Sequence, residues 1–197
     1  YFTAPTTGPL CREYQSQFAV GYVAVTTRDD RPVSVTSMAT FRSTGGVALS
    51  NLGVPGSQLK HFNRTSDAQV QAELRAYHPD MIVLAFGTNE GFAVDLDMAA
   101  YEAGLRAQVR RLRRLAGSEV PMLLIGPPNA MTRDNGIAYA GGFAPTVCET
   151  GLMVPGHIAA VRSVQRSVAA DMGLAYWDWA RAMGNDCAVY QWRTDGF

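Results

Sequence analysis

Asn89 follows an apolar run, and its side-chain amide could donate hydrogen bonds to a bound group. It belongs to the segment Gly-Thr-Asn-Glu, residues 87–90, which comes directly after six consecutive apolar residues, 81–86. That run is too short to span a membrane and is typical of a strand buried on both faces. The polar segment would therefore stand at the carboxyl end of a strand, where open α/β sheets bind their ligands.

Two other turns have the same relation to a predicted strand. Residues 53–56 follow a short strand predicted over 47–52, and residues 126–129 follow one predicted over 121–125. In a parallel sheet these turns share one edge, so a backbone N–H of the first turn and the Asn89 amide could converge on one small anion. Neutral donors of this kind stabilise a charge that appears only in the transition state, as in an oxyanion hole. The local pattern leaves open that Asn89 only caps a turn.

The predicted elements around these turns alternate between strand and helix. Apolar side chains recur at helical spacing within 59–77, 97–116 and 155–172, and a last strand is predicted over 174–177. Alternation of this kind with short connections predicts an α/β fold with a parallel sheet and helices on both faces, over about residues 46–184.

Residues 1–45 have a different composition. Two runs rich in β-branched and aromatic residues, 18–27 and 32–41, flank the polar cluster 28–31, which predicts an antiparallel hairpin. A hairpin alone is marginally stable in water, so this β-rich segment would need partner strands.

Composition limits the classes of function. The chain has 197 residues, 47% of them hydrophobic, and its 17 basic and 17 acidic side chains cancel. Such a chain can bury a core, has no electrostatic reason to bind nucleic acid, and has no apolar run long enough to span a membrane. Its cysteines, Cys11, Cys148 and Cys187, are too widely spaced for a zinc knuckle, although two could form a disulfide. No metal or cofactor site is visible, so metal-independent chemistry is predicted.

The turns described above resemble two motifs of the SGNH (GDSL-type) hydrolases. Residues 87–90 resemble the G-x-N-[DE] block of that family, and residues 51–56, Asn-Leu-Gly-Val-Pro-Gly, resemble the glycine block that precedes it. The resemblance implies a flavodoxin-like three-layer α/β/α fold and ester hydrolysis through a serine nucleophile. It also implies that the Gly56 N–H and the Asn89 amide are oxyanion-hole donors.

Within this family the segments 86–90 and 175–184 look most like those of peptidoglycan and polysaccharide O-acetylesterases. The resemblance therefore implies an acetylated polysaccharide or a small ester as substrate, and a periplasmic or secreted protein. Some members carry a β-rich, carbohydrate-binding-like module, of which residues 1–45 would be the tail, with residues 46–197 as the hydrolase core. The neighbours of Asn89 are candidate substrate contacts: Gly87, Thr88 and Glu90.

The sequence departs from the family in its nucleophile and base. No Gly-Asp-Ser is present, and the serines upstream of Gly56 have no matching neighbours: Ser34, Ser37, Ser43 and Ser50. Asp195 could begin the family's Asp-x-x-His block and so be the triad aspartate. The three histidines, His61, His78 and His157, are expected to be surface or helix-capping residues.

These departures lead us to expect a chain truncated at both ends, which carries the oxyanion half of an esterase site. Flanking segments or a second chain would then supply the nucleophile and the base. Two alternatives remain open: another esterase, lipase or thioesterase of the same fold, and a catalytically inactive carbohydrate-binding homologue.

Overall fold

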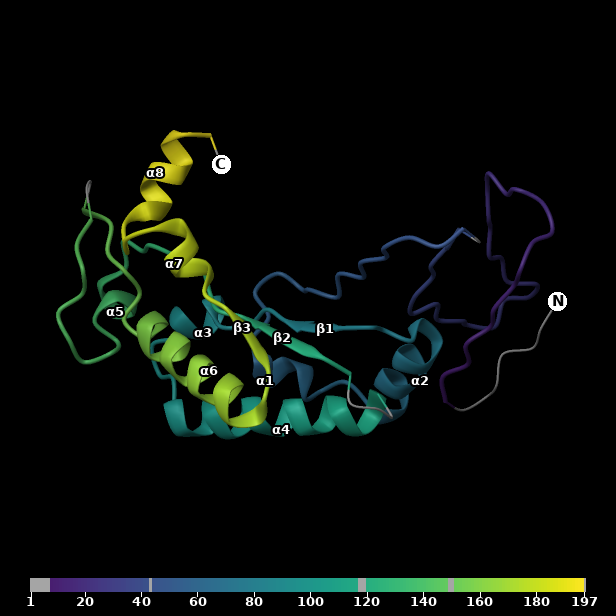
Figure 1. The fold of residues 1–197 in the computed structure, drawn as a ribbon, viewed down its shortest axis with the longest axis horizontal. Helices are drawn as coiled ribbons and strands as arrows, with labels where there is room; N and C mark the ends of the chain where they lie inside the picture. The colour runs from purple at the N-terminus through teal and green to yellow at the C-terminus, as the bar shows by residue number, and fades with distance from the viewer. Residues whose placement is uncertain (1–7, 43, 117–119, 149–150, 197) are drawn as a thin grey trace. The chain divides into compact units, whose positions relative to one another are not determined.

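A computed structural model describes residues 8–42, 44–116, 120–148 and 151–196, and divides the chain into two compact units, Tyr1–Gly53 and Val54–Phe197. The boundary between the units lies later than the predicted one after residue 45. Figure 1 shows the ribbon of each unit.

The described residues of the first unit form neither helix nor strand. The predicted hairpin of 18–27 with 32–41 is therefore wrong, and so is the strand predicted over 47–52. Their apolar side chains are exposed, with Phe18 at 82% and Leu49 at 88%. A strand is stable only when a neighbouring strand and a packed face support it, and these runs have neither in the described structure.

A parallel sheet of three strands lies at the centre of the second unit, in the order β1 (Ile82–Leu84), β2 (Met122–Ile125), β3 (Ala175–Trp177). Leu84 is in register with Leu124, and Leu124 with Tyr176. The predicted α/β class with a parallel sheet is confirmed.

Four helices lie within the segments where helical periodicity predicts them: α1 (Leu59–Phe62), α2 (Asp67–Tyr77), α4 (Met98–Ala116) and α6 (Ile158–Met172). Local signals explain their ends. The Ser66 hydroxyl caps α2 by accepting the Gln69 N–H at 3.1 Å, and α2 ends at His78, before a proline. Gly173, with a φ of 65°, ends α6 in the left-handed conformation.

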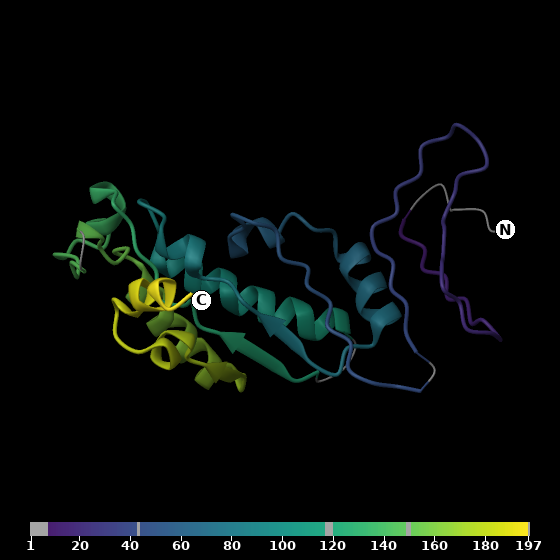
Figure 2. The ribbon, with the colours of Figure 1, turned by 90° about the horizontal axis from the view of Figure 1, so that it is seen from above.

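The hydrophobic core lies between one face of the sheet and these four helices. Leu84 and Leu124 point to this face and are at most 5% exposed. They pack in one cluster with the apolar stripes of the helices, which include Leu59, Leu105, Val109, Leu112, Val161 and Val168. Figures 1 and 2 show α4 running lengthwise beside the strands.

The opposite face of the sheet is largely open. Val83 and Trp177, which point to it, are 39% and 44% exposed, and Met81 just before β1 is 53% exposed. The prediction that the central strand is buried on both faces is therefore wrong. Of the three layers expected, the described residues of the second unit form the sheet and one helical layer.

Four short helices lie outside the predicted pattern: α3 (Thr88–Gly91), α5 (Asn135–Ala138), α7 (Trp179–Met183) and α8 (Ala188–Thr194). Within the described parts of the chain, no helix is both long enough and apolar enough to cross a membrane.

Candidate functional site

Gly56 lies in a tight turn that precedes α1. The Ser57 N–H donates to the Val54 carbonyl at 3.0 Å, Pro55 occupies the second position, and Gly56 has a φ of 77°. These are the features of a type II turn, whose third position favours glycine. The donor of the turn's hydrogen bond is the N–H of Ser57, so the N–H of Gly56 takes no part in that bond.

Asn89 lies in α3 and is hydrogen-bonded to the segment that follows Gly56. Its side-chain Nδ2 donates to the Ser57 carbonyl at 2.8 Å, and its own carbonyl accepts from Gln58 Nε2 at 2.9 Å. The amide therefore bonds to a distant segment instead of capping its own turn. An asparagine amide carries two hydrogens, so one remains for another acceptor. The structure thus brings the two segments of the predicted donor pair together.

Glu90 is buried and hydrogen-bonded to backbone. It is 2% exposed, and its oxygens accept the N–H of Leu59 at 2.6 Å and that of Gly87 at 3.0 Å. Both carboxylate oxygens thus accept backbone N–H groups of the protein. Thr88 is half-buried in the first turn of α3. The contacts of Gly87, Thr88 and Glu90 with substrate stay predictions.

The Gly87 turn packs against the turn after β2 and against α6. A Cβ added at Gly87 would lie 2.7 Å from Gln165 Nε2 and 3.1 Å from Pro127 Cδ. Gln165 is fully buried and donates to the Phe86 carbonyl at 2.7 Å and to the Tyr101 hydroxyl at 2.8 Å. Gln165 is not among the site residues predicted from the sequence. The available signal was a polar residue on the apolar stripe of α6, between Val161 and Val168.

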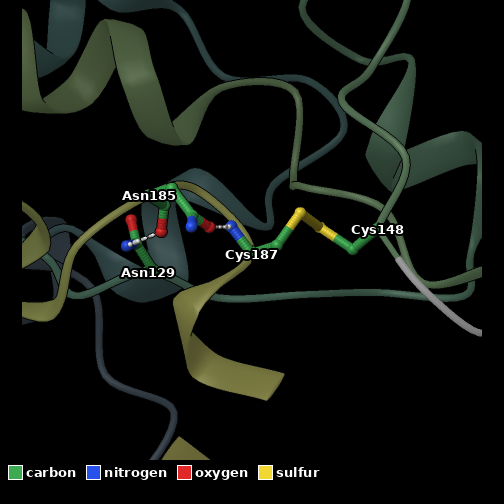
Figure 3. Close-up of a disulfide and its surroundings, with 4 residues drawn as sticks. All are labelled: Asn129, Cys148, Asn185 and Cys187. Atoms are coloured by element: carbon green, nitrogen blue, oxygen red, sulfur yellow. Dashed lines mark hydrogen bonds between the residues drawn. A yellow bond between two sulfur atoms is a disulfide. The ribbon is translucent and has the colours of Figure 1, made fainter. Parts of the chain in front are cut away.

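The turn after β2 is also tied to the connection between α7 and α8, through Asn129 and Asn185 (Figure 3). Asn129 Nδ2 donates to the Asn185 carbonyl at 2.7 Å, and its Oδ1 accepts from Arg162 at 2.9 Å. Burial lowers the pKa of the Arg162 guanidinium, which also donates to the carbonyls of two prolines at the same turn. Beside this junction, Cys148 and Cys187 form a disulfide, and Cys11 is a free, exposed thiol.

Asp195, the predicted triad aspartate, is the C-cap of α8. Its carboxylate accepts from Gln191 Nε2 of the same helix at 2.8 Å. It lines a cavity of about 530 Å³ together with the disulfide and residues of α8. Its catalytic role stays a prediction.

The histidines occupy helix ends, as expected. His61 Nδ1 accepts the Gln58 N–H at 3.1 Å, His78 is the C-cap of α2, and His157 is the N-cap of α6.

The upstream serines belong to the first unit. Ser34, Ser37 and Ser50 are exposed there, and Ser43 lies outside the described residues. Among the described residues, no group of three or more His, Cys, Asp or Glu side chains is arranged to hold a metal ion.

Comparison with known proteins decides the family. The model of the GDSL-like lipase/acylhydrolase family matches residues 20–197. This chain belongs to that family. A comparison with curated protein sequences gives no match.

Two solved structures are similar to this GDSL-like chain. A peptidoglycan O-acetylesterase is 26% identical with a TM-score of 0.61, and the match covers 75% of this chain and 38% of that one. An acetyl xylan esterase is 18% identical with a TM-score of 0.46, and the match covers 73% of this chain and 62% of that one. The chain thus spans less than two thirds of the length of each of the two.

Proposed function

We propose that the second unit supplies the oxyanion-stabilising part of a serine-dependent esterase that removes O-acetyl groups from peptidoglycan or another polysaccharide. The observation that carries this proposal is the hydrogen bond from Asn89 Nδ2 to the Ser57 carbonyl, which joins the predicted donor to the residue after Gly56. Membership of the GDSL-like family and similarity to a peptidoglycan O-acetylesterase support it.

In the proposed reaction, a serine hydroxyl attacks the acetyl carbonyl and a histidine takes its proton. The carbonyl oxygen becomes negatively charged in the tetrahedral intermediate, where the Gly56 N–H and the second Asn89 hydrogen donate to it. The histidine then protonates the sugar oxygen, which leaves as a hydroxyl, and water releases acetate from the serine. Other residues of the complete enzyme supply the serine and histidine, from flanking segments or a second chain, and Asp195 orients the histidine.

A protein of the periplasm or the cell exterior fits this proposal, since disulfides persist in oxidising compartments and Cys148 is bonded to Cys187. Small esters are alternative substrates at the same site. Acetate release from O-acetylated peptidoglycan, compared with release from acetylated xylan and from a small aryl acetate, would identify the preferred class.

Substitution of Asn89 tests the proposed site. In the full-length protein, Asn89→Ala should lower kcat on an acetyl ester by about a hundred- to a thousandfold, because one oxyanion donor is lost. The matched control is Asn135→Ala, at an exposed position in α5. A folded Asn89→Ala protein with the kcat of the parent would refute the assignment.

A further inference from the structure

Glu90 holds a buried negative charge that the proposed chemistry does not use. Glu90 is 2% exposed, and burying an unpaired carboxylate would cost free energy of folding. Charge-assisted hydrogen bonds from backbone N–H groups offset this cost. The two backbone N–H groups that donate to Glu90 lie at the starts of two different helices. Leu59 is the first residue of α1, and Gly87 is the N-cap of α3. One side chain therefore satisfies an otherwise unpaired N–H at the start of each helix.

These bonds are part of a compact junction between the segment after Gly56 and the segment around Asn89. Leu59 N–H to Glu90 Oε1, at 2.6 Å, is one link across it. The other links are Asn89 Nδ2 to the Ser57 carbonyl and Gln58 Nε2 to the Asn89 carbonyl. Gln58 and Asn89 are only partly buried, whereas the Glu90 carboxylate lies in the buried interior of the junction. Its bonds are therefore the ones best shielded from competition with water.

We propose that Glu90 is a positioning residue that fixes the separation of the Gly56 and Asn89 donors, a role that rests on the proposed esterase function. Oxyanion donors act only when they lie about 2.7–3.1 Å from the position of the oxyanion. A displacement of about 1 Å can cost on the order of a hundredfold in rate. Glu90 holds Leu59 with one oxygen and Gly87 with the other, and so ties together the backbones that carry the two donors.

Glu90→Gln in the full-length protein tests this proposal. Glutamine has nearly the same size as glutamate, but one of the two oxygens is replaced by an NH₂ group. That NH₂ group would face a backbone N–H, and two donors cannot hydrogen-bond to each other, so one of the two hydrogen bonds is lost. We expect kcat on an acetyl ester to fall about 10- to 100-fold with KM unchanged, because the carboxylate is buried and both of its oxygens already accept backbone N–H groups. Glu102→Gln, at a side chain that is 40% exposed in α4, is the matched control and should leave kcat unchanged.

A double-mutant cycle separates positioning from general damage to the fold. If Glu90 acts through the oxyanion donors, Glu90→Gln should lower kcat much less in an Asn89→Ala background than in the parent. Equal effects in both backgrounds, or a parent kcat in Glu90→Gln, would overturn the inference. An Asn89→Ala protein with unchanged kcat would instead overturn the proposed function, so the two failures are distinguishable.

Glu90→Asp provides a second variant if Glu90→Gln does not fold. Aspartate keeps the charge but is one methylene shorter, so it can hold only one of the two N–H groups in place. We expect a smaller loss of kcat, again with KM unchanged. A folded Glu90→Asp protein with the kcat of the parent would contradict the positioning role.

Discussion

Gly56 and Gly87 both have a positive φ, but their surroundings differ. At Gly56, where φ is 77°, a Cβ would meet nothing within 4 Å. At Gly87, where φ is 122°, a Cβ would lie 2.7 Å from Gln165 Nε2 and 3.0 Å from Val161 Cγ1. Glycine at position 56 is favoured by backbone conformation alone. At position 87 it is also required by the close approach of α6.

Gly87→Ala should therefore destabilise the protein by about 2–4 kcal/mol, which combines the cost of the left-handed conformation with that of overpacking. The free energy of unfolding, measured in urea, checks this value. The control is Gly104→Ala in α4, where a Cβ meets nothing within 4 Å and helix propensity predicts a gain of up to about 1 kcal/mol. Equal free energies of unfolding for the two variants would show that α6 does not pack closely enough against Gly87 to exclude a Cβ.

At the scale of elements, a polar junction and a disulfide hold the segment that carries α7 and α8. Asn129, after β2, donates to the carbonyls of Ala180 and Asn185. Asn185 Oδ1 in turn accepts the N–H of Cys187 at 2.9 Å, next to the bond to Cys148. The position of α8, and of Asp195 at its end, thus depends on contacts with both the turn after β2 and the segment around Cys148.

Loss of the disulfide should destabilise this part of the molecule. The bonded cysteines are 39 residues apart, for which the loop-entropy relation gives about 4 kcal/mol. Cys148→Ser with Cys187→Ser should lower Tm and speed amide exchange in α8 more than in β2. Cys11→Ser, at the exposed free thiol, is the control and should leave Tm unchanged. An unaltered Tm in the double variant would contradict the expected contribution of the bond.

At the scale of the whole second unit, the two faces of the sheet differ. Leu84 points to the helical face and is 5% exposed, whereas its neighbour Val83 points to the other face and is 39% exposed. Parallel sheets normally have both faces covered. In this structure, stability should therefore come mainly from the helical face.

Alanine substitutions at adjacent positions of β1 test this asymmetry. Leu84→Ala should cost about 2–5 kcal/mol, because it leaves a cavity in the core. Val83→Ala should cost less than about 1 kcal/mol, because the side chain is already partly solvated. Urea unfolding of both variants measures the difference. A cost at Val83 as large as that at Leu84 would mean that the open face is covered in solution.

Features that depend on residues close together in the chain could be predicted from the sequence. Helical spacing over 59–77, 97–116 and 155–172 located the segments that form α1 and α2, α4, and α6. Short apolar runs located the three strands. The motifs around Gly56 and Asn89 identified the family, because they specify the local chemistry of two turns.

Features that depend on contacts between distant segments became visible in the folded structure. The β-branched runs of the first unit have strand propensity but form no strand in the described residues, because no neighbouring strand or packed face supports them. The burial of Glu90, the insertion of Gln165 beneath the Gly87 turn, and the pairing of Cys148 with Cys187 each join segments far apart in the chain. Hydrophobic periodicity reports which face of an element is apolar, but not what lies against it, so these contacts could not be predicted from the sequence.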